Sequence, residues 1–211
     1  PGKLGVWKSA HLNKQLKNVK VGEQTAAGLT INVSWLLGNI NVPYEITYLI
    51  QNDGSVKVTG AMDFTNTQLP ELPRFGMRTT LSNWYTDLSY YGRGPHENYI
   101  DRNHGSFLGI YSDKVANQYY KGYIRPQESG NKTDVRWLSL TNNQGMGVKI
   151  EGAQALGFTA INHSVEDLDP GLTKKQQHPT DLPPRNQVFL SVDLKQRGVG
   201  GDDSWGSLPH A

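Results

Sequence analysis

The sequence predicts an all-β protein, built as one antiparallel two-sheet sandwich domain over residues 1–211. Segments in which apolar and polar residues alternate recur along the chain, and Gly and Pro number 23 and 11. Helix-forming segments rich in Ala, Leu and Glu are nearly absent. This combination is typical of strands joined by tight turns. A chain of 211 residues is long enough to bury a sizeable core, and β-sandwiches of this length commonly form a single domain.

The clearest element is a hairpin over residues 44–64. Apolar and polar side chains alternate along 44–51 and again along 56–64, and Asn52-Asp53-Gly54-Ser55 lies between the two runs. Alternation on both sides of an Asp-Gly turn is the strongest short signal for a hairpin. We therefore expect two long, paired strands here.

Other strands are expected from the same pattern. The prolines of 69–73 predict an extended segment at a sheet edge, leading into the strand at 75–81. Residues 142–145 and 169–171 carry the Gly, Asn, Asp and Pro of turns. Helical turns are expected only around 112–118 and 172–177. The remaining strands are expected at 29–35, 107–111, 135–140, 147–150, 157–160 and 188–194.

Composition excludes several classes of protein. The 21 basic and 19 acidic side chains are interspersed and leave a net charge of +2, so nucleic acid is not an expected partner. The absence of cysteine excludes a disulfide framework and a thiolate metal site, and it leaves the compartment open. No apolar run approaches the length of a membrane span, so no membrane association is expected. The first residues show no signal-peptide pattern and look like the interior of a longer chain.

Residues 90–102 form the first of four segments that are richer in polar and aromatic side chains than a strand core requires. Arg93, His96 and Glu97, with Asp101 and Arg102, could line a polar site. The alternative is a set of ion pairs in which the arginines and acids neutralise one another and brace a long loop.

The second segment, 119–137, contains Glu128 and Asp134. Such acids could serve as general acid and base in a sugar epimerase or hydrolase, or they could support the loop. The third segment, 178–184, contains His178 in a Pro-rich loop, where a hydrogen-bonded structural role competes with that of a base.

The fourth segment, 198–206, places Trp205 after three glycines and two acids. Gly permits backbone angles that other residues avoid, and an indole offers a broad apolar face that could pack on a sugar or close the end of a core. The adjacent acids could bind sugar hydroxyls or tie the loop to its own backbone. No metal site, phosphate-binding loop, dinucleotide fingerprint or nucleophile elbow is present. The candidate loop residues are Gly200, Gly201, Asp202, Asp203 and Trp205.

Four ordered motifs together resemble the C-terminal domain of the large β-galactosidases of glycoside hydrolase family 2. The resemblance covers nearly the whole chain, including its first residues. The motifs are LPELPRFGM at 69–77, YGRGPHENY at 91–99 followed by Asp101 and Arg102, RPQESGNKTDVRW at 125–137 and GVGGDDSWG at 198–206.

This resemblance implies a galactose mutarotase-like supersandwich in an enzyme that hydrolyses terminal non-reducing β-D-galactosides with retention. The family's acid/base and nucleophile glutamates lie on a preceding TIM-barrel domain, which this chain lacks. We therefore assign no catalytic residue here and expect the isolated chain to be inactive. Trp205 matches the tryptophan that contacts the sugar in the family. The family's Mg and Na ions are bound mainly by other domains, so no cofactor or metal ligand is assigned.

The sequence departs from the family at its end. Family members continue past the tryptophan loop with a Tyr-rich strand, so we expect the last strand to be truncated here. Two alternatives stay open: a stand-alone carbohydrate-binding module, and a mutarotase-like epimerase using His96 with Glu128. The expected partners are the galactoside and the upstream barrel. Oligomeric state and the choice between cytoplasm and periplasm stay open.

Overall fold

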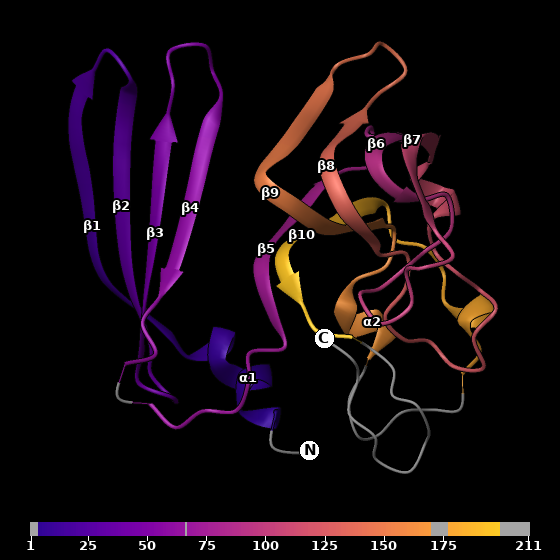
Figure 1. Ribbon diagram of the computed structural model, residues 1–211, viewed down its shortest axis with the longest axis horizontal. Helices are drawn as coiled ribbons and strands as arrows, with labels where there is room; N and C mark the ends of the chain where they lie inside the picture. The colour runs from indigo at the N-terminus through magenta and orange to yellow at the C-terminus, as the bar shows by residue number, and fades with distance from the viewer. Residues whose placement is uncertain (1–3, 66, 170–176, 199–211) are drawn as a thin grey trace. The chain divides into compact units, whose positions relative to one another are not determined.

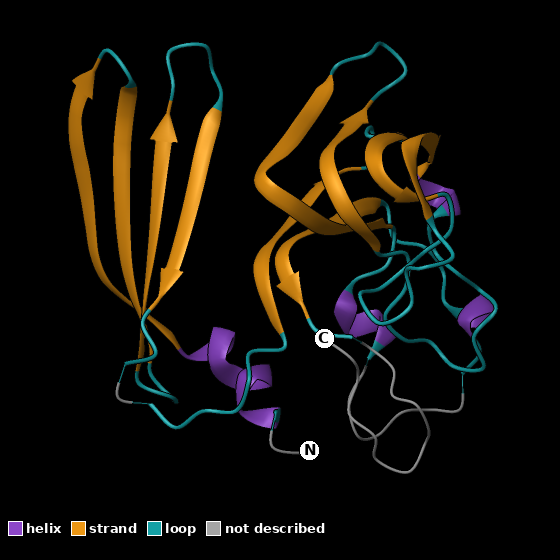
Figure 2. Ribbon diagram, in the orientation of Figure 1, coloured by secondary structure: helices purple, strands orange, loops and turns teal. Residues whose placement is uncertain are grey.

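The computed structural model describes residues 4–65, 67–169 and 177–198 (Figure 1). Contacts divide the chain into two compact units, Pro1–Pro73 and Arg74–Ala211. The first unit contains a four-stranded sheet and the second a six-stranded sheet, and every strand pair is antiparallel. Strands dominate the described residues (Figure 2). The predicted all-β class with two antiparallel sheets is confirmed, and the single domain stays a prediction.

The first unit is a meander that follows a short helix. The predicted hairpin is confirmed: Tyr44 lies opposite Met62, and Ile50 lies opposite Val56. Gly54 has a φ of +85°, in the left-handed region that favours glycine in such turns. The elements, in sheet order after the helices, are α1 (Gly5–Ala10), the 3₁₀ turn η1 (His11–Asn13), β1 (Lys14–Thr25), β2 (Gly28–Leu37), β3 (Val42–Ile50) and β4 (Val56–Met62).

The core of the first unit lies beside α1. Trp7 and Ala10 on the helix are buried with Leu37 and Val42. The indole N–H of Trp7 donates a hydrogen bond to the carbonyl of Pro70 at 3.2 Å. This bond fixes the extended segment 69–73 against α1 within the unit.

The second unit contains the larger sheet. Its strands are adjacent in the order β5-β10-β9-β8-β6-β7, so β5 and β7 are its edge strands. The elements are β5 (Arg74–Ser82), β6 (Asp87–Gly94), β7 (Phe107–Lys114), η2 (Val115–Asn117), β8 (Lys132–Thr141), β9 (Gly147–Ile161), α2 (Val165–Leu168), η3 (Pro179–Asp181) and β10 (Gln187–Gln196).

Two sequence predictions need correction in this unit. The strands expected at 147–150 and 157–160 are the two ends of one strand, β9. The helical turn expected at 112–118 shrinks to η2, because β7 continues to Lys114. The helical turn expected at 172–177 lies almost entirely outside the described residues.

Both faces of the larger sheet are covered along its central strands. Val188, Leu190 and Val192 on β10 join the main hydrophobic core. Alternate residues of a strand point to opposite faces, so Ser191 and Asp193 lie on the other face. These two polar side chains are nevertheless buried. Asp193 is paired with Arg74, the first residue of β5.

Candidate functional site

The predicted sugar-contacting residue lies beyond the described part of the chain. Trp205 and its neighbours Gly200, Gly201, Asp202 and Asp203 fall within residues 199–211, outside the described ranges. The structure does describe β10, the strand that leads into this loop and ends at Gln196. The site is therefore built from the side chains that hold the end of β10.

Arg74 connects two of the four sequence motifs to β10. Its guanidinium NH2 group donates to Glu128 Oε1 at 2.7 Å, and its Nε lies 3.3 Å from Asp193 Oδ2. Arg74 comes from the motif at 69–77 and Glu128 from the motif at 125–137, while Asp193 lies five residues before Gly198. The base of the glycine loop is thus held by residues that are distant in sequence.

Asp193 fits here because both neighbouring strands carry glycine opposite it. Its register partners are Gly76 on β5 and Gly157 on β9. A Cβ at Gly76 would lie only 2.5 Å from Asp193 Oδ1, so a side chain there would displace the carboxylate. Asp193 is 2% exposed, and burial raises the pKa of its carboxyl to about 6, with Glu128 adding to the effect and Arg74 opposing it. Opposite charge from Arg74 is what keeps this carboxylate tolerable inside the protein.

Glu97 ties the loop after β6 to the loop before β8. Its Oε1 accepts hydrogen bonds from the Arg102 guanidinium at 2.7 Å and from the Tyr123 hydroxyl. Its Oε2 accepts from the backbone N–H of Gly130 at 2.7 Å. The guanidinium of Arg102 also lies over the ring of Tyr99, 4.6 Å from its centroid. Glu97 is therefore occupied by protein partners.

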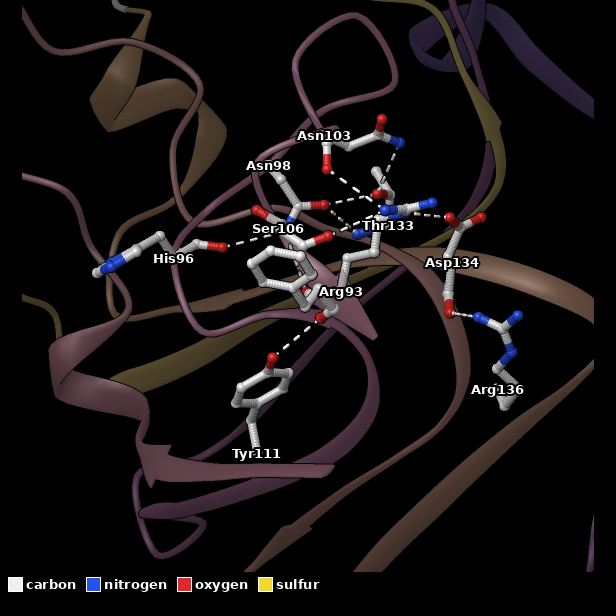
Figure 3. A network of polar contacts seen from close by, with 10 residues as sticks. Arg93, His96, Asn98, Asn103, Ser106, Tyr111, Thr133, Asp134 and Arg136 are labelled. Carbon is white, nitrogen blue, oxygen red and sulfur yellow. Dashed lines mark hydrogen bonds and ion pairs between the residues drawn. The ribbon is translucent and has the colours of Figure 1, made fainter. Parts of the chain in front are cut away.

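Asn98 is the centre of a second set of bonds between the same loops, shown in Figure 3. Its side-chain NH₂ donates to the carbonyls of Arg93 and His96, each at 3.0 Å. Its Oδ1 accepts from the backbone N–H and the hydroxyl of Thr133, at 3.0 and 2.5 Å. Asn98 is fully buried, so every one of these bonds replaces water.

Arg93 is paired with an acid 41 residues away. Its Nε donates to Asp134 Oδ2 at 2.5 Å, and its NH1 donates to the carbonyl of Ser106 at 2.9 Å (Figure 3). Asp134 has a φ of +53°, a left-handed conformation that Asp tolerates better than most residues, and it lies where the register of β8 shifts. The bulge turns the Asp134 carboxylate toward Arg93.

The charged residues of 90–102 do form ion pairs, but only one of the two pairs lies within the segment. Arg102 pairs with Glu97 inside the segment, whereas Arg93 reaches Asp134 in the next motif. Only the Arg93–Asp134 pair crosses between motifs, and it joins the end of β6 to the start of β8.

His96 lies apart from these carboxylates. In Figure 3 only its backbone carbonyl joins the network, and its exposed imidazole points away from Arg93. Within the described residues it makes no contact with Glu128, which is paired with Arg74. His178 caps η3 instead: its Nδ1 lies 2.9 Å from the Thr180 hydroxyl. Arg93, Glu97 and Glu128 are thus joined through the two loops, and His96 stays outside.

Lys132 is a further buried charge that the sequence did not reveal. It is 2% exposed, and its Nζ donates to Gln118 Oε1 at 3.0 Å and to the carbonyl of Gly130 at 3.2 Å. Burial lowers the pKa of its ammonium to about 8, against the opposing effect of Glu97 and Asp113. Its bonds hold the loop before β8 onto the turn after β7.

The described ranges contain neither a candidate metal site nor a candidate membrane span. No three His, Asp or Glu side chains there come together in a group that could hold a metal ion. No helix among the same residues has both the length and the apolar character to cross a membrane.

Comparison with known proteins identifies the family of the chain. A family model described as "Beta galactosidase small chain" matches residues 2–211. The chain belongs to the β-galactosidase small-chain family. The family resemblance drawn from the four motifs is thereby confirmed.

Named relatives of this β-galactosidase small chain are much longer proteins. A β-galactosidase of Priestia megaterium is 39% identical over 204 residues, covering 97% of this chain and 19% of the relative. One from Halalkalibacterium halodurans is 30% identical over 208 residues, covering 98% and 20%. One from Lactobacillus delbrueckii subsp. bulgaricus is 33% identical over 214 residues, covering 98% and 20%. The chain spans about a fifth of the length of these relatives.

Sequence reasoning missed several residues that organise this region. The sequence places Arg74 and Asn98 only within motifs, Asp193 only within a strand, and Lys132 only within a loop. A charged residue flanked by apolar neighbours in a strand, as Asp193 is between Val192 and Leu194, is the one signal that could have identified a buried acid.

Proposed function

We propose that this chain forms the part of a β-galactosidase that presents Trp205 to the substrate, while the catalytic carboxylates lie in the remaining four-fifths of the protein. The whole enzyme would hydrolyse terminal non-reducing β-D-galactosides with retention of configuration. Support comes from the small-chain family match and from relatives named β-galactosidase that extend far beyond the matched region.

The observation that carries this proposal is the meeting of the motifs at the end of β10. Arg74 bonds to Glu128 and lies beside Asp193, so two motifs hold the strand from which the third motif, with Trp205, continues. Glu97 and Asn98 of the remaining motif bond to Gly130 and Thr133, next to Glu128. Positioning a binding residue needs a supporting shell of this kind.

The charges around the described carboxylates favour support over catalysis. Retaining hydrolysis needs two carboxyl groups about 5 Å apart, one of which must be protonated to act as the acid. Glu97, Glu128 and Asp134 each bond to an arginine, so protein partners already occupy these carboxylates. We accordingly place the acid, the nucleophile and the Mg and Na ions in the upstream part of the protein.

Trp205 would act through its surface alone. The C–H face of a galactose ring packs on an indole, which orients the sugar without taking part in bond breaking. Burying about 60 Å² of apolar sugar surface is worth ~1.5 kcal/mol, and the aromatic contact adds about 0.5 kcal/mol. A total near 2 kcal/mol corresponds to roughly a 30-fold effect on kcat/KM.

The test is the Trp205→Ala variant of the full-length enzyme, assayed with a chromogenic β-galactoside. We expect kcat/KM to fall about 30-fold, while Phe107→Ala, a change at an exposed aromatic on β7, leaves it unchanged. Unchanged kcat/KM in Trp205→Ala would contradict the proposal. So would turnover by the 211-residue chain alone that disappears in Glu97→Gln or Glu128→Gln.

A further inference from the structure

A second tryptophan lies on the surface of the six-stranded unit, in the turn between β5 and β6. Trp84 is 71% exposed, which is unusual for so large an apolar side chain. Its backbone is nevertheless fixed. The N–H of Trp84 donates to the Ser82 hydroxyl at 3.3 Å, the N–H of Tyr85 donates to the Ser82 carbonyl at 3.3 Å, and the carbonyl of Thr86 accepts from Val115 N at 3.0 Å. The turn therefore presents the indole from a defined position.

The indole borders a hollow of the size of a sugar ring or two. This hollow measures about 420 Å³, and a neighbouring one measures about 330 Å³. The two share the lining residues Asn83 and Thr86, so they lie next to each other. The larger hollow is lined by Asn83, Trp84, Thr86, Asn142, Asn143 and Gln144.

The chemistry of the larger hollow is neutral and rich in amides. Asn142 holds its own turn, because its Oδ1 accepts from the N–H groups of Gln144 and Met146 at 2.9 and 3.0 Å. The side-chain amides of Asn143 and Gln144 have no protein partner in the described part of the chain, so their donors and acceptors are available to a ligand. No charged side chain lines this hollow.

An aromatic plane beside free amides fits one class of ligand. Sugar rings carry an apolar C–H face, which packs on an indole, and hydroxyls that both donate and accept, as amides do. A charged ligand would find no counter-charge in the larger hollow, and Lys114, which lines the smaller one, is already paired with Asp87. An apolar protein segment would have to bury the amides without partners. We propose that Trp84 and the 142–144 turn bind a neutral oligosaccharide, with one ring on the indole and the next toward Asn83 and Thr86. This subsite uses none of the residues of the Trp205 loop.

The test is a titration of the ¹⁵N-labelled 211-residue chain with lactose and with a β-1,4-linked galactotetraose, followed through the indole N–H signals and, in the Trp84→Ala variant, through the backbone amide signals that the same sugars shift. Trp84→Ala identifies the relevant signal by its loss. We expect that signal to shift with a Kd of about 1 mM, since shallow sites bury little of the sugar. Trp84→Ala should weaken binding about tenfold, and Asn143→Ala severalfold. Phe107→Ala is the matched control, because this aromatic is as exposed as Trp84 and lines neither hollow.

Four results would overturn the inference. The Trp84 signal could stay unshifted at about 50 mM sugar, fifty times the expected Kd, or the affinity could be the same in Trp84→Ala. Shifts that vanish in Trp205→Ala would place the sugar on the other loop. A dimer in sedimentation that Trp84→Ala converts to monomer would identify a protein contact. Shifts that persist in Trp205→Ala support the subsite whether or not Trp205 matters for hydrolysis, so the two proposals fail independently.

Discussion

Replacing Asn98 with Ala should destabilise the six-stranded unit more than any exposed change in the same loops. The side chain is fully buried and makes four hydrogen bonds, two to the carbonyls of Arg93 and His96 and two from Thr133. A net contribution near 1 kcal/mol for each bond gives a loss of about 4 kcal/mol in the free energy of unfolding. For a protein of this size the melting temperature should fall by about 12 °C.

Urea unfolding followed by circular dichroism measures this loss directly. The matched control is Asn143→Ala, which removes an exposed Asn side chain without a protein partner and should change stability by no more than ~0.5 kcal/mol. Asn98→Asp adds a second test: it keeps the acceptor for Thr133 but turns an oxygen toward two carbonyls. Its cost should be larger at pH 7 than at pH 4, because only the ionised form repels both carbonyls. A loss below about 1 kcal/mol in Asn98→Ala would refute this account of the network.

Two further predictions concern the sheet itself. Burial raises the pKa of Asp193 to about 6, so the folded protein holds this proton more tightly than the unfolded chain, and the stabilisation present below about pH 4 is lost as the pH rises through 6. The free energy of unfolding of the unmodified protein should therefore fall by up to about 3 kcal/mol, relative to Asp193→Asn, between pH 4 and 6. Urea unfolding of both proteins across this pH range measures the difference, and parallel pH profiles would count against the prediction. Leu138→Ala, at a fully buried core position, should cost about 3 kcal/mol. Leu108→Ala, 46% exposed on β7, should cost clearly less in the same thermal melts, and equal losses would argue against the assigned core.

The sequence was sufficient to predict strands whose local pattern agrees with their pairing. The β3–β4 hairpin follows from alternation around Asp53-Gly54, and β5 and β10 from similar alternation. β1 was missed because its pairing with β2 shifts register twice, so its apolar residues do not alternate cleanly. A bulge is decided by the partner strand and leaves little trace in a single segment.

β6 was missed for a different reason. Its glycines suggest a loop, but Gly92 lies within the strand. A Cβ at Gly92 would come within 2.7 Å of Val135 Cγ2. The glycine is required by the close approach of β8 and not by a turn. Local sequence does not distinguish these two uses.

Ion-pair partners were the least predictable part of the candidate site. The composition of residues 90–102 suggested that its own charges would neutralise one another, yet Arg93 pairs with Asp134. That choice depends on the sheet order, which places β6 beside β8, and on the bulge that turns Asp134 toward it. The partner of a charged residue therefore depends on which strands are neighbours in the sheet, and a single sequence does not reveal that order.

The position of β10 within the sheet explains how the chain can hold the start of the tryptophan loop. An edge strand would have one neighbour, whereas β10 is hydrogen-bonded to β5 on one side and β9 on the other. Both neighbours carry glycine beside Asp193, which leaves room for the carboxylate and for its contact with Arg74. Glu128 pairs with the same arginine. A change at Arg74, Glu128 or Asp193 should therefore alter the backbone position of Gly198, where the loop begins. The motifs at 69–77 and 125–137 are far apart in sequence, and they meet beside β10 through Arg74 and Glu128.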